Sequence, residues 1–154
     1  MGGMNERPKS WASSPATRRS MQGNKARDTS AELAVRRLLH ARGLRYRVNY
    51  RPLRELRRTA DIVFTRQKIA VLIDGCFWHG CPLHYTRPTA NREFWDAKVE
   101  RNKVRDADTR RVLEERGWTV LRFWEHEAPI DVAAAIGDAV AAKRLGDVLG
   151  NGAA

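Results

Sequence analysis

The spacing of apolar residues along the first half of the chain predicts one helix followed by three strands. The helix begins after Thr29, in the capping-box sequence Thr-Ser-Ala-Glu, and stops before Gly43. Its apolar residues recur at helical spacing: Ala31, Val35, Leu38 and Leu39. Apolar and polar residues alternate over 44–50, which predicts a half-buried strand. Two apolar runs, 60–64 and 69–73, predict a hairpin at the centre of a sheet.

The second half of the pattern adds two helices and one strand. A polar, turn-rich segment over 74–91 precedes a long helix over about 92–115, which ends at an Arg-Gly pair. A strand over 118–124 and an alanine-rich helix over about 131–144 follow. The order helix, three strands, helix, strand, helix is typical of an α/β fold with a mixed central sheet flanked by helices.

Length and composition suggest how these elements are organised. The 154 residues suffice for one folded domain. Residues 1–28 mix Gly, Ser, Pro and Arg with few apolar side chains, which favours a basic arm that folds only against a partner. We therefore expect a flexible arm over 1–28, a folded domain over 29–146 and a flexible tail over 147–154.

The net charge indicates the kind of partner. Lys and Arg number 29 against 18 Asp and Glu, which gives a net charge of +11. Arginine-rich charge suits the phosphates of a nucleic acid. An acidic membrane surface would attract the same charge, but no apolar run approaches spanning length and none follows the N-terminal charges. We expect an intracellular protein that binds nucleic acid.

Two cysteines and two histidines predict a structural zinc site. Cys76, Cys81 and His84 fall within nine residues of one another. His126, directly after the last predicted strand, can supply a fourth ligand. Two thiolates and two imidazoles suit tetrahedral zinc, and a closed set of four ligands is structural rather than catalytic. The alternatives are a disulfide between the cysteines, which a reducing compartment disfavours, or a loop whose Cys and His are unrelated.

Two aspartates and a histidine predict a second, catalytic site. Asp61 lies inside an apolar strand, where a carboxylate is costly unless it is paired or binds a cation. The alternative partner of Asp61 is the basic loop over 51–58. Asp74 follows the other strand of the hairpin, so both carboxylates can converge on Mg²⁺. His79 is then free to act as general base or acid, unless it is itself the zinc ligand and His84 is spare.

Three further polar residues have alternative interpretations. The predicted long helix has one face formed by Trp95, Val99, Asn102, Asp106, Thr109 and Leu113. Asn102 and Asp106 interrupt that packed face, so they either face solvent or point into a site and position a histidine. Glu32 either serves only the capping box or belongs to the outer part of the same site.

The run Asp-Gly-Cys-Phe-Trp-His-Gly-Cys-Pro at 74–82 closely resembles the very-short-patch repair (Vsr) family of DNA mismatch endonucleases. The resemblance covers roughly 14–128, with supporting pieces at Ala16–Met21, Arg27–Thr29, Glu32, Asp61, Glu93–Trp95, Asn102–Asp106 and Gly117–Leu121. It implies a restriction-endonuclease-like fold of the PD-(D/E)XK type with a zinc-stabilised loop and catalytic Mg²⁺. It also implies a nick 5′ to the thymine of a T:G mismatch, the product of 5-methylcytosine deamination.

The resemblance also implies roles for the catalytic residues. Asp61 would be the principal Mg²⁺ ligand, and His79 the water-activating histidine with Asp106 supporting it. Where the best-known member of the family has Thr-His, this chain has Ile73 and Asp74. The Ile73 carbonyl could make the metal contact, and Asp74 could bind metal or take the role of that histidine. The lysine that many related nucleases place after the second acidic residue is absent, which again leaves His79 as the base.

The same resemblance implies an aromatic wedge that intercalates beside the mismatch. Phe77, Trp78 and Trp95 would form it, with Met21 assisting from the other groove. Inserting apolar side chains requires unstacking, and a mispair lowers that cost. The alternative for Phe77 and Trp78 is ordinary core packing, which is harder inside a polar loop.

The implied partners and the rival functions complete the sequence-based expectations. We expect a monomer that acts on double-stranded DNA carrying a T:G mismatch, with a functional link to a cytosine-5 DNA methyltransferase. The implied location is cytoplasmic, nucleoid-associated and bacterial. One rival function is a restriction-type endonuclease that cuts perfect duplex. The other is a zinc-containing DNA-binding module without catalysis.

Overall fold

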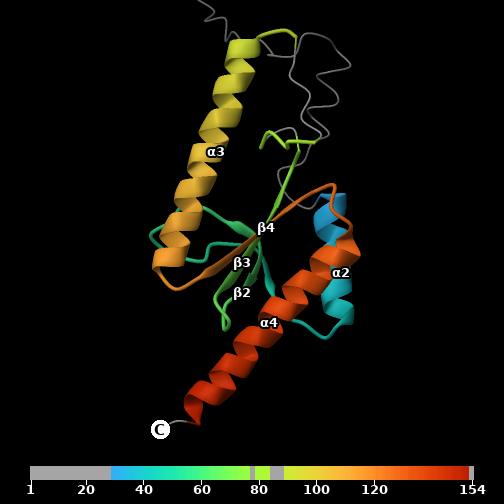
Figure 1. Cartoon of the computed structure of the whole chain (residues 1–154), viewed down its shortest axis with the longest axis vertical. Coiled ribbons are helices and arrows are strands. Elements are labelled where there is room, and N and C mark those ends of the chain that lie inside the picture. Colours follow the sequence, from blue (N-terminus) through green and yellow to red (C-terminus); the bar gives the residue numbers. More distant parts are fainter. Residues whose placement is uncertain (1–28, 77–78, 84–88, 153–154) are drawn as a thin grey trace, which may run out of the picture.

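The computed structural model describes residues 29–76, 79–83 and 89–152. Its elements in chain order are α2 (Ser30–Ala41), β1 (Arg47–Tyr50), β2 (Ala60–Phe64), β3 (Ile69–Asp74), α3 (Arg92–Glu115), β4 (Thr119–Trp124) and α4 (Pro129–Asn151). A single four-stranded sheet lies between helices (Figure 1). The predicted α/β architecture is therefore confirmed for these residues. The proposed arm over 1–28 lies outside them.

The sheet is mixed and has the strand order β1-β2-β3-β4. β2 pairs antiparallel with both β1 and β3, which confirms the hairpin and its central position. β3 and β4 are parallel, with Asp74 opposite Trp124 at their carboxyl ends. Since parallel strands end at the same edge of a sheet, the segments after β3 and β4 leave the sheet side by side.

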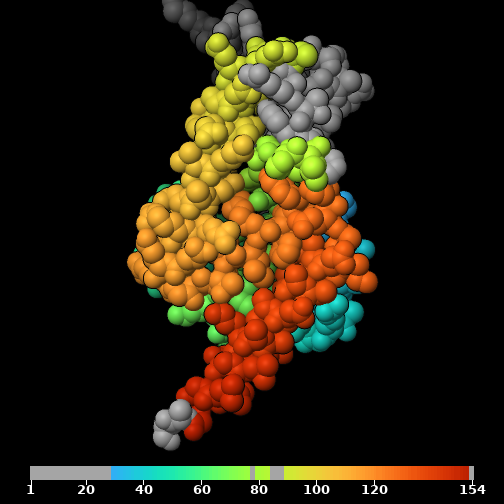
Figure 2. Space-filling model, in the orientation of Figure 1, coloured from blue at the N-terminus to red at the C-terminus, as the bar shows by residue number. Residues whose placement is uncertain are grey.

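The two faces of the sheet are covered unequally. α2 and α4 cover one face with the larger core cluster, which comprises Val35, Leu39, Leu44, Ile62, Phe64, Ile69, Val71, Val132, Ala133, Ile136 and Val140. α3 contributes Leu113 to a smaller cluster on the other face, which also includes Ala60, Val63, Ala70, Trp118 and Val120. The N-terminal half of α3 extends beyond the sheet, and the end of α4 projects in the opposite direction (Figure 2).

Two predicted elements differ from the structure. The strand expected over 44–50 is formed only from Arg47, and Val48 and Tyr50 are 44% and 38% exposed. The alternation predicts half-burial, but β1 is an edge strand and three of its four residues are exposed. The last helix does not end near 144: α4 continues through two glycines to Asn151. Among the described residues, no helix is long and apolar enough to cross a membrane.

Candidate active site and metal centre

Asp61 lies near the start of β2 and faces the end of β3. Its Oδ2 accepts a hydrogen bond from the backbone N–H of Ile73 at 2.7 Å. The partner is therefore the neighbouring strand rather than the basic loop over 51–58. The hairpin brings Asp61 to the same edge of the sheet as Asp74, as the sequence predicted.

The electrostatic environment of Asp61 is unfavourable to its charge. The pKa of Asp61 is raised from 3.8 to about 7, first by burial and then by the negative charges of Glu32 and Asp74. The Ile73 N–H and the Arg36 charge act in the opposite direction. A divalent cation beside this carboxylate would stabilise the ionised form, because opposite charge reverses the effect of burial. The oxygen ligands also suit a hard ion such as Mg²⁺.

Glu32 is more than a capping residue. Thr29 Oγ1 accepts a hydrogen bond from the Glu32 N–H at 3.3 Å, which confirms half of the predicted capping box. The Glu32 side chain is only 2% exposed and forms an ion pair with Arg36 at 3.1 Å. A carboxylate that serves only a helix cap has no need of this burial. Its negative charge raises the pKa of Asp61. Glu32 therefore belongs with Asp61 and Asp74 to one carboxylate cluster.

His79 and Asp106 meet across the gap between the loop after β3 and the middle of α3. His79 Nδ1 lies 2.5 Å from Asp106 Oδ2. Burial alone would raise the pKa of Asp106, but the hydrogen bond with His79 and the charge of Arg122 lower it below its usual value. The sequence left open whether Asp106 faces solvent or contacts a histidine, and in the structure it contacts His79. Asn102, one turn earlier, contacts Arg105 at 3.5 Å.

Arg122, in the middle of β4, was not singled out from the sequence. Its Nε and NH2 donate to the two carboxylate oxygens of Asp74 at 2.8 and 2.7 Å. Its NH2 also lies 3.1 Å from Asp106 Oδ2. The signal that identified Asp61, a charge inside an apolar strand, would have identified Arg122 as well.

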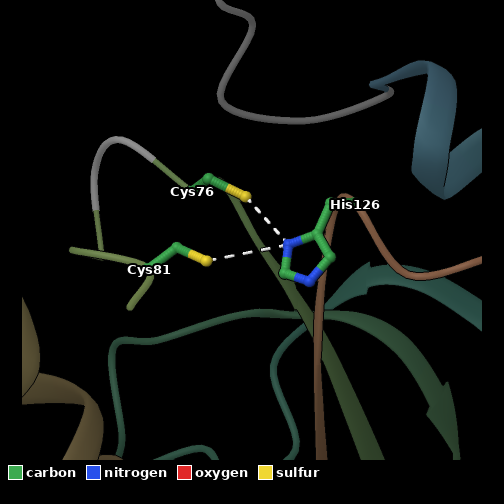
Figure 3. Close-up of side chains that lie close together, drawn as sticks. All are labelled: Cys76, Cys81 and His126. Carbon is green, nitrogen blue, oxygen red and sulfur yellow. Dashed lines mark hydrogen bonds between the residues drawn. The ribbon is translucent and has the colours of Figure 1, made fainter. Parts of the chain in front are cut away.

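A second cluster lies beside the carboxylates. Cys76, Cys81 and His126 place their ligand atoms within 4.8 Å of one another (Figure 3). Cys76 follows β3 and His126 follows β4, so the parallel pairing of these strands brings the two together. Both cysteines are buried and neither forms a disulfide, so the disulfide alternative is not adopted. His84 lies outside the described residues.

The geometry of this cluster suits a tetrahedral metal ion. His126 Nδ1 lies 3.3 Å from Cys76 Sγ and 3.7 Å from Cys81 Sγ. In a tetrahedral zinc site, two ligand atoms that both bind the zinc are roughly 3.5 Å from each other. Burial, together with Cys81 and the Glu125 charge, raises the pKa of Cys76 to about 11. Two thiolates would therefore need a cation to be stable here.

The residues of the expected wedge are mostly outside the described part of the chain. Met21, Phe77 and Trp78 lie there. Trp95, in the first turn of α3, is 5% exposed and packs edge-on against Phe94 with ring centroids 5.2 Å apart. Trp95 would have to be uncovered before it could contact a base.

One edge of the mixed sheet carries a carboxylate cluster, a histidine–aspartate pair and a Cys/His cluster. In a strongly basic chain, this combination is typical of a DNA endonuclease. A family model described as DNA mismatch endonuclease Vsr matches residues 12–84. The chain belongs to the Vsr family of endonucleases.

Individual relatives agree with this assignment. The type II nicking enzyme V.NaeI of Lentzea aerocolonigenes is 45% identical over 122 residues, which span 78% of this chain and 74% of that protein. The type II nicking enzyme V.NmeDIP of Neisseria meningitidis serogroup C is 41% identical, over 71% of this chain and 74% of that protein. The DNA mismatch endonuclease Vsr of Escherichia coli K12 is 35% identical, over 71% and 70%.

Proposed function

We propose that this endonuclease nicks one strand of duplex DNA 5′ to the thymine of a T:G mismatch left by 5-methylcytosine deamination. The observation that carries the proposal is the convergence of Asp61, Asp74 and the His79–Asp106 pair at the edge of the sheet where the mismatch-family motif begins. The relatives named as nicking enzymes and as a mismatch endonuclease support the same reaction.

Two metal ions complete the proposed site. Asp61 and the Ile73 carbonyl would hold Mg²⁺, while Cys76, Cys81 and His126 would hold zinc with His84 as the fourth ligand. Mg²⁺ bound there would stabilise the negative charge that develops on the scissile phosphate. The donor types agree with this division, since carboxylate oxygens suit Mg²⁺ whereas thiolates and imidazoles suit zinc.

His79 is the proposed general base. Asp106 accepts the Nδ1–H of His79, which leaves Nε2 without a proton and able to take one from the attacking water. The lowered pKa of Asp106 keeps this carboxylate ionised, so it also stabilises the imidazolium formed after the transfer. The P–O bond to the leaving 3′ oxygen then breaks, and this oxygen is protonated from solvent.

Mismatch recognition is assigned to the aromatic wedge. Phe77, Trp78 and Trp95 would enter the base stack, with Met21 on the other side of the duplex. Unstacking a base step costs a few kcal/mol, and this cost is lower at a T:G mispair than at a correctly paired step. Because Trp95 is buried, we expect it to follow Phe77 and Trp78 into the stack rather than to lead.

A strand-resolved nicking assay tests this function. Duplexes with T:G, T:A and C:G at one position and a different label on each strand are incubated with Mg²⁺ or EDTA. We expect a single Mg²⁺-dependent nick, 5′ to the thymine of T:G only, which Asp61→Ala abolishes while DNA binding persists. Breaks in both strands of the matched duplexes would instead establish the restriction-type rival. Mismatch binding without any nick would establish the non-catalytic module.

A further inference from the structure

Arg122 links three elements around the candidate active site. From the middle of β4 it binds both oxygens of Asp74 at the end of β3 and approaches Asp106 on α3. Its side chain is 18% exposed. A bidentate guanidinium–carboxylate pair fixes both distance and orientation, which a single hydrogen bond does not.

The pair also separates Asp74 from His79. His79 Nε2 lies 3.8 Å from Asp74 Oδ1, beyond hydrogen-bond distance. Without Arg122, a buried Asp74 carboxylate would lack a cation and would seek the nearest donor, since an unpaired buried charge is strongly unfavourable. The nearest histidine nitrogen is Nε2, the atom that the proposed reaction needs free.

The arrangement favours site geometry over stability. Arg122 NH1 is buried and has no hydrogen-bond partner in the described part of the chain, although Nε and NH2 are fully engaged. An unpaired buried donor lowers stability. A direct contact between Arg122 and DNA fits less well, because its two paired nitrogens are held by carboxylates and NH1 is inaccessible to solvent.

We propose that Arg122 is a positioning residue of the active site, an inference that rests on the proposed function. It holds Asp106 against His79 Nδ1 and holds Asp74 away from Nε2, so His79 keeps its proton on Nδ1 and its Nε2 lone pair for water. Asp74 is accordingly the partner of Arg122 and not a ligand of Mg²⁺.

Rates and affinities of three variants test this role. Single-turnover nicking with enzyme in excess gives the rate of the chemical step, and fluorescence anisotropy gives the Kd for the same T:G duplex. We expect Arg122→Met to slow nicking about 10- to 100-fold, as losses of groups that orient a catalytic residue do, with Kd changed less than about threefold. Arg122→Lys should nick almost as slowly as Arg122→Met, because an ammonium group cannot bind a carboxylate bidentately. Arg110→Met, which breaks an exposed pair with Glu114 on α3, should match wild type.

A double-mutant cycle separates positioning from a merely structural contribution. Asp74→Asn combined with Arg122→Met removes both charges, so we expect the double variant to nick faster than Arg122→Met alone. Guanidinium ion should also restore part of the activity of Arg122→Ala. Thermal unfolding and metal content confirm that each variant is folded. An unimpaired Arg122→Met, an equal loss of affinity and rate, or a double variant no faster than Arg122→Met would overturn the proposal.

A spectroscopic measurement keeps this test independent of nicking. Long-range ¹H–¹⁵N correlation spectra of the free protein show which ring nitrogen of His79 carries the proton, with His79→Ala to assign the signal. We expect the Nδ1–H form in wild type and in Asp74→Asn, and a shift toward Nε2–H in Arg122→Met. An unchanged tautomer in Arg122→Met would refute the positioning role even if the wild type cut no T:G duplex. Failure of wild-type nicking with the expected tautomer shift would refute only the proposed function.

Discussion

The carboxylate cluster and the Cys/His cluster lie at the same edge of the sheet but are held in place differently. Asp61 and Asp74 are strand residues, fixed by the β2–β3 and β3–β4 pairings and by Arg122. Cys81 and His126 lie in loops outside any helix or strand. The carboxylates are therefore preorganised by the fold, and they repel one another. At the Cys/His cluster, the proposed metal ion would fix the loops that carry the thiols and the imidazole.

The largest expected effect follows from breaking the Cys/His cluster. Structural zinc binding contributes roughly 10–16 kcal/mol in small domains, so Cys81→Ser should lose bound zinc, melt at a lower temperature, and lose both nicking and T:G binding. Metal analysis, thermal unfolding and anisotropy measure these changes. His40→Ala, an exposed histidine on α2, is the matched control. Full activity in a zinc-free Cys81→Ser protein would show that the cluster is not a metal site.

Asp61→Asn should lose catalysis while keeping zinc and DNA binding. A metal ion contributes several kcal/mol of charge stabilisation in a transition state, so its loss should slow nicking at least about 1000-fold. Zinc content should stay unchanged and the Kd for T:G duplex should remain within a few-fold of wild type. Single-turnover assays and metal analysis distinguish the two clusters here. Loss of zinc from Asp61→Asn would contradict their independence.

The two members of the histidine–aspartate pair should differ in effect. His79→Ala removes the proposed base, and we expect a loss of about 100- to 10,000-fold in the nicking rate. Asp106→Asn keeps the base but loses its orientation, and we expect about 10- to 100-fold. Both variants should retain T:G binding and zinc. Equal losses in the two would mean that His79 acts only together with an ionised Asp106.

The smallest expected effect is on stability and depends on pH. The pKa of Asp61 is raised in the folded state, so the folded protein binds more protons than the unfolded chain between about pH 4 and 7. The stability that the protonated Asp61 contributes is therefore lost as pH rises through this range. The gain in stability of Asp61→Asn over wild type should therefore grow as pH rises from 5, reaching about 2 kcal/mol at pH 8.

Thermal unfolding with and without Mg²⁺ measures this effect. Mg²⁺ should raise the melting temperature of wild type at pH 8 but not that of Asp61→Asn. The Cys/His cluster should show the opposite response, since removing its metal lowers stability. A melting temperature of Asp61→Asn that follows wild type at every pH would show that Asp61 carries no electrostatic strain.

The sequence was sufficient for most elements and for the residues whose chemistry is conspicuous. The sequence predicts the long helix at its observed bounds. It also draws attention to Asp61, Cys76 and Cys81, because a charge in an apolar strand or a pair of nearby thiols needs a local explanation. The sequence-based prediction ends α4 too early, because two glycines weaken the helical pattern that the leucines beside them continue. Burial of β1 was overestimated because alternation does not reveal whether a strand is at an edge.

Pairings across strands could not be predicted from spacing. Arg122 contacts Asp74 only because β4 lies parallel to β3 in one register. The Cys76 N–H likewise donates to Glu125 Oε1 at 3.0 Å across the same pair of strands. Neither partner is identifiable until the register is known, since a one-residue shift would turn every side chain of the strand to the other face.

The parallel pairing of β3 and β4 also has a consequence for the time at which activity appears. The two strands are separated by the whole of α3, and contacts between distant segments form slowly during folding. Both the Arg122–Asp74 pair and the approach of His126 to Cys76 require this pairing. We therefore expect an incompletely folded or newly synthesised chain to be unable to cut DNA.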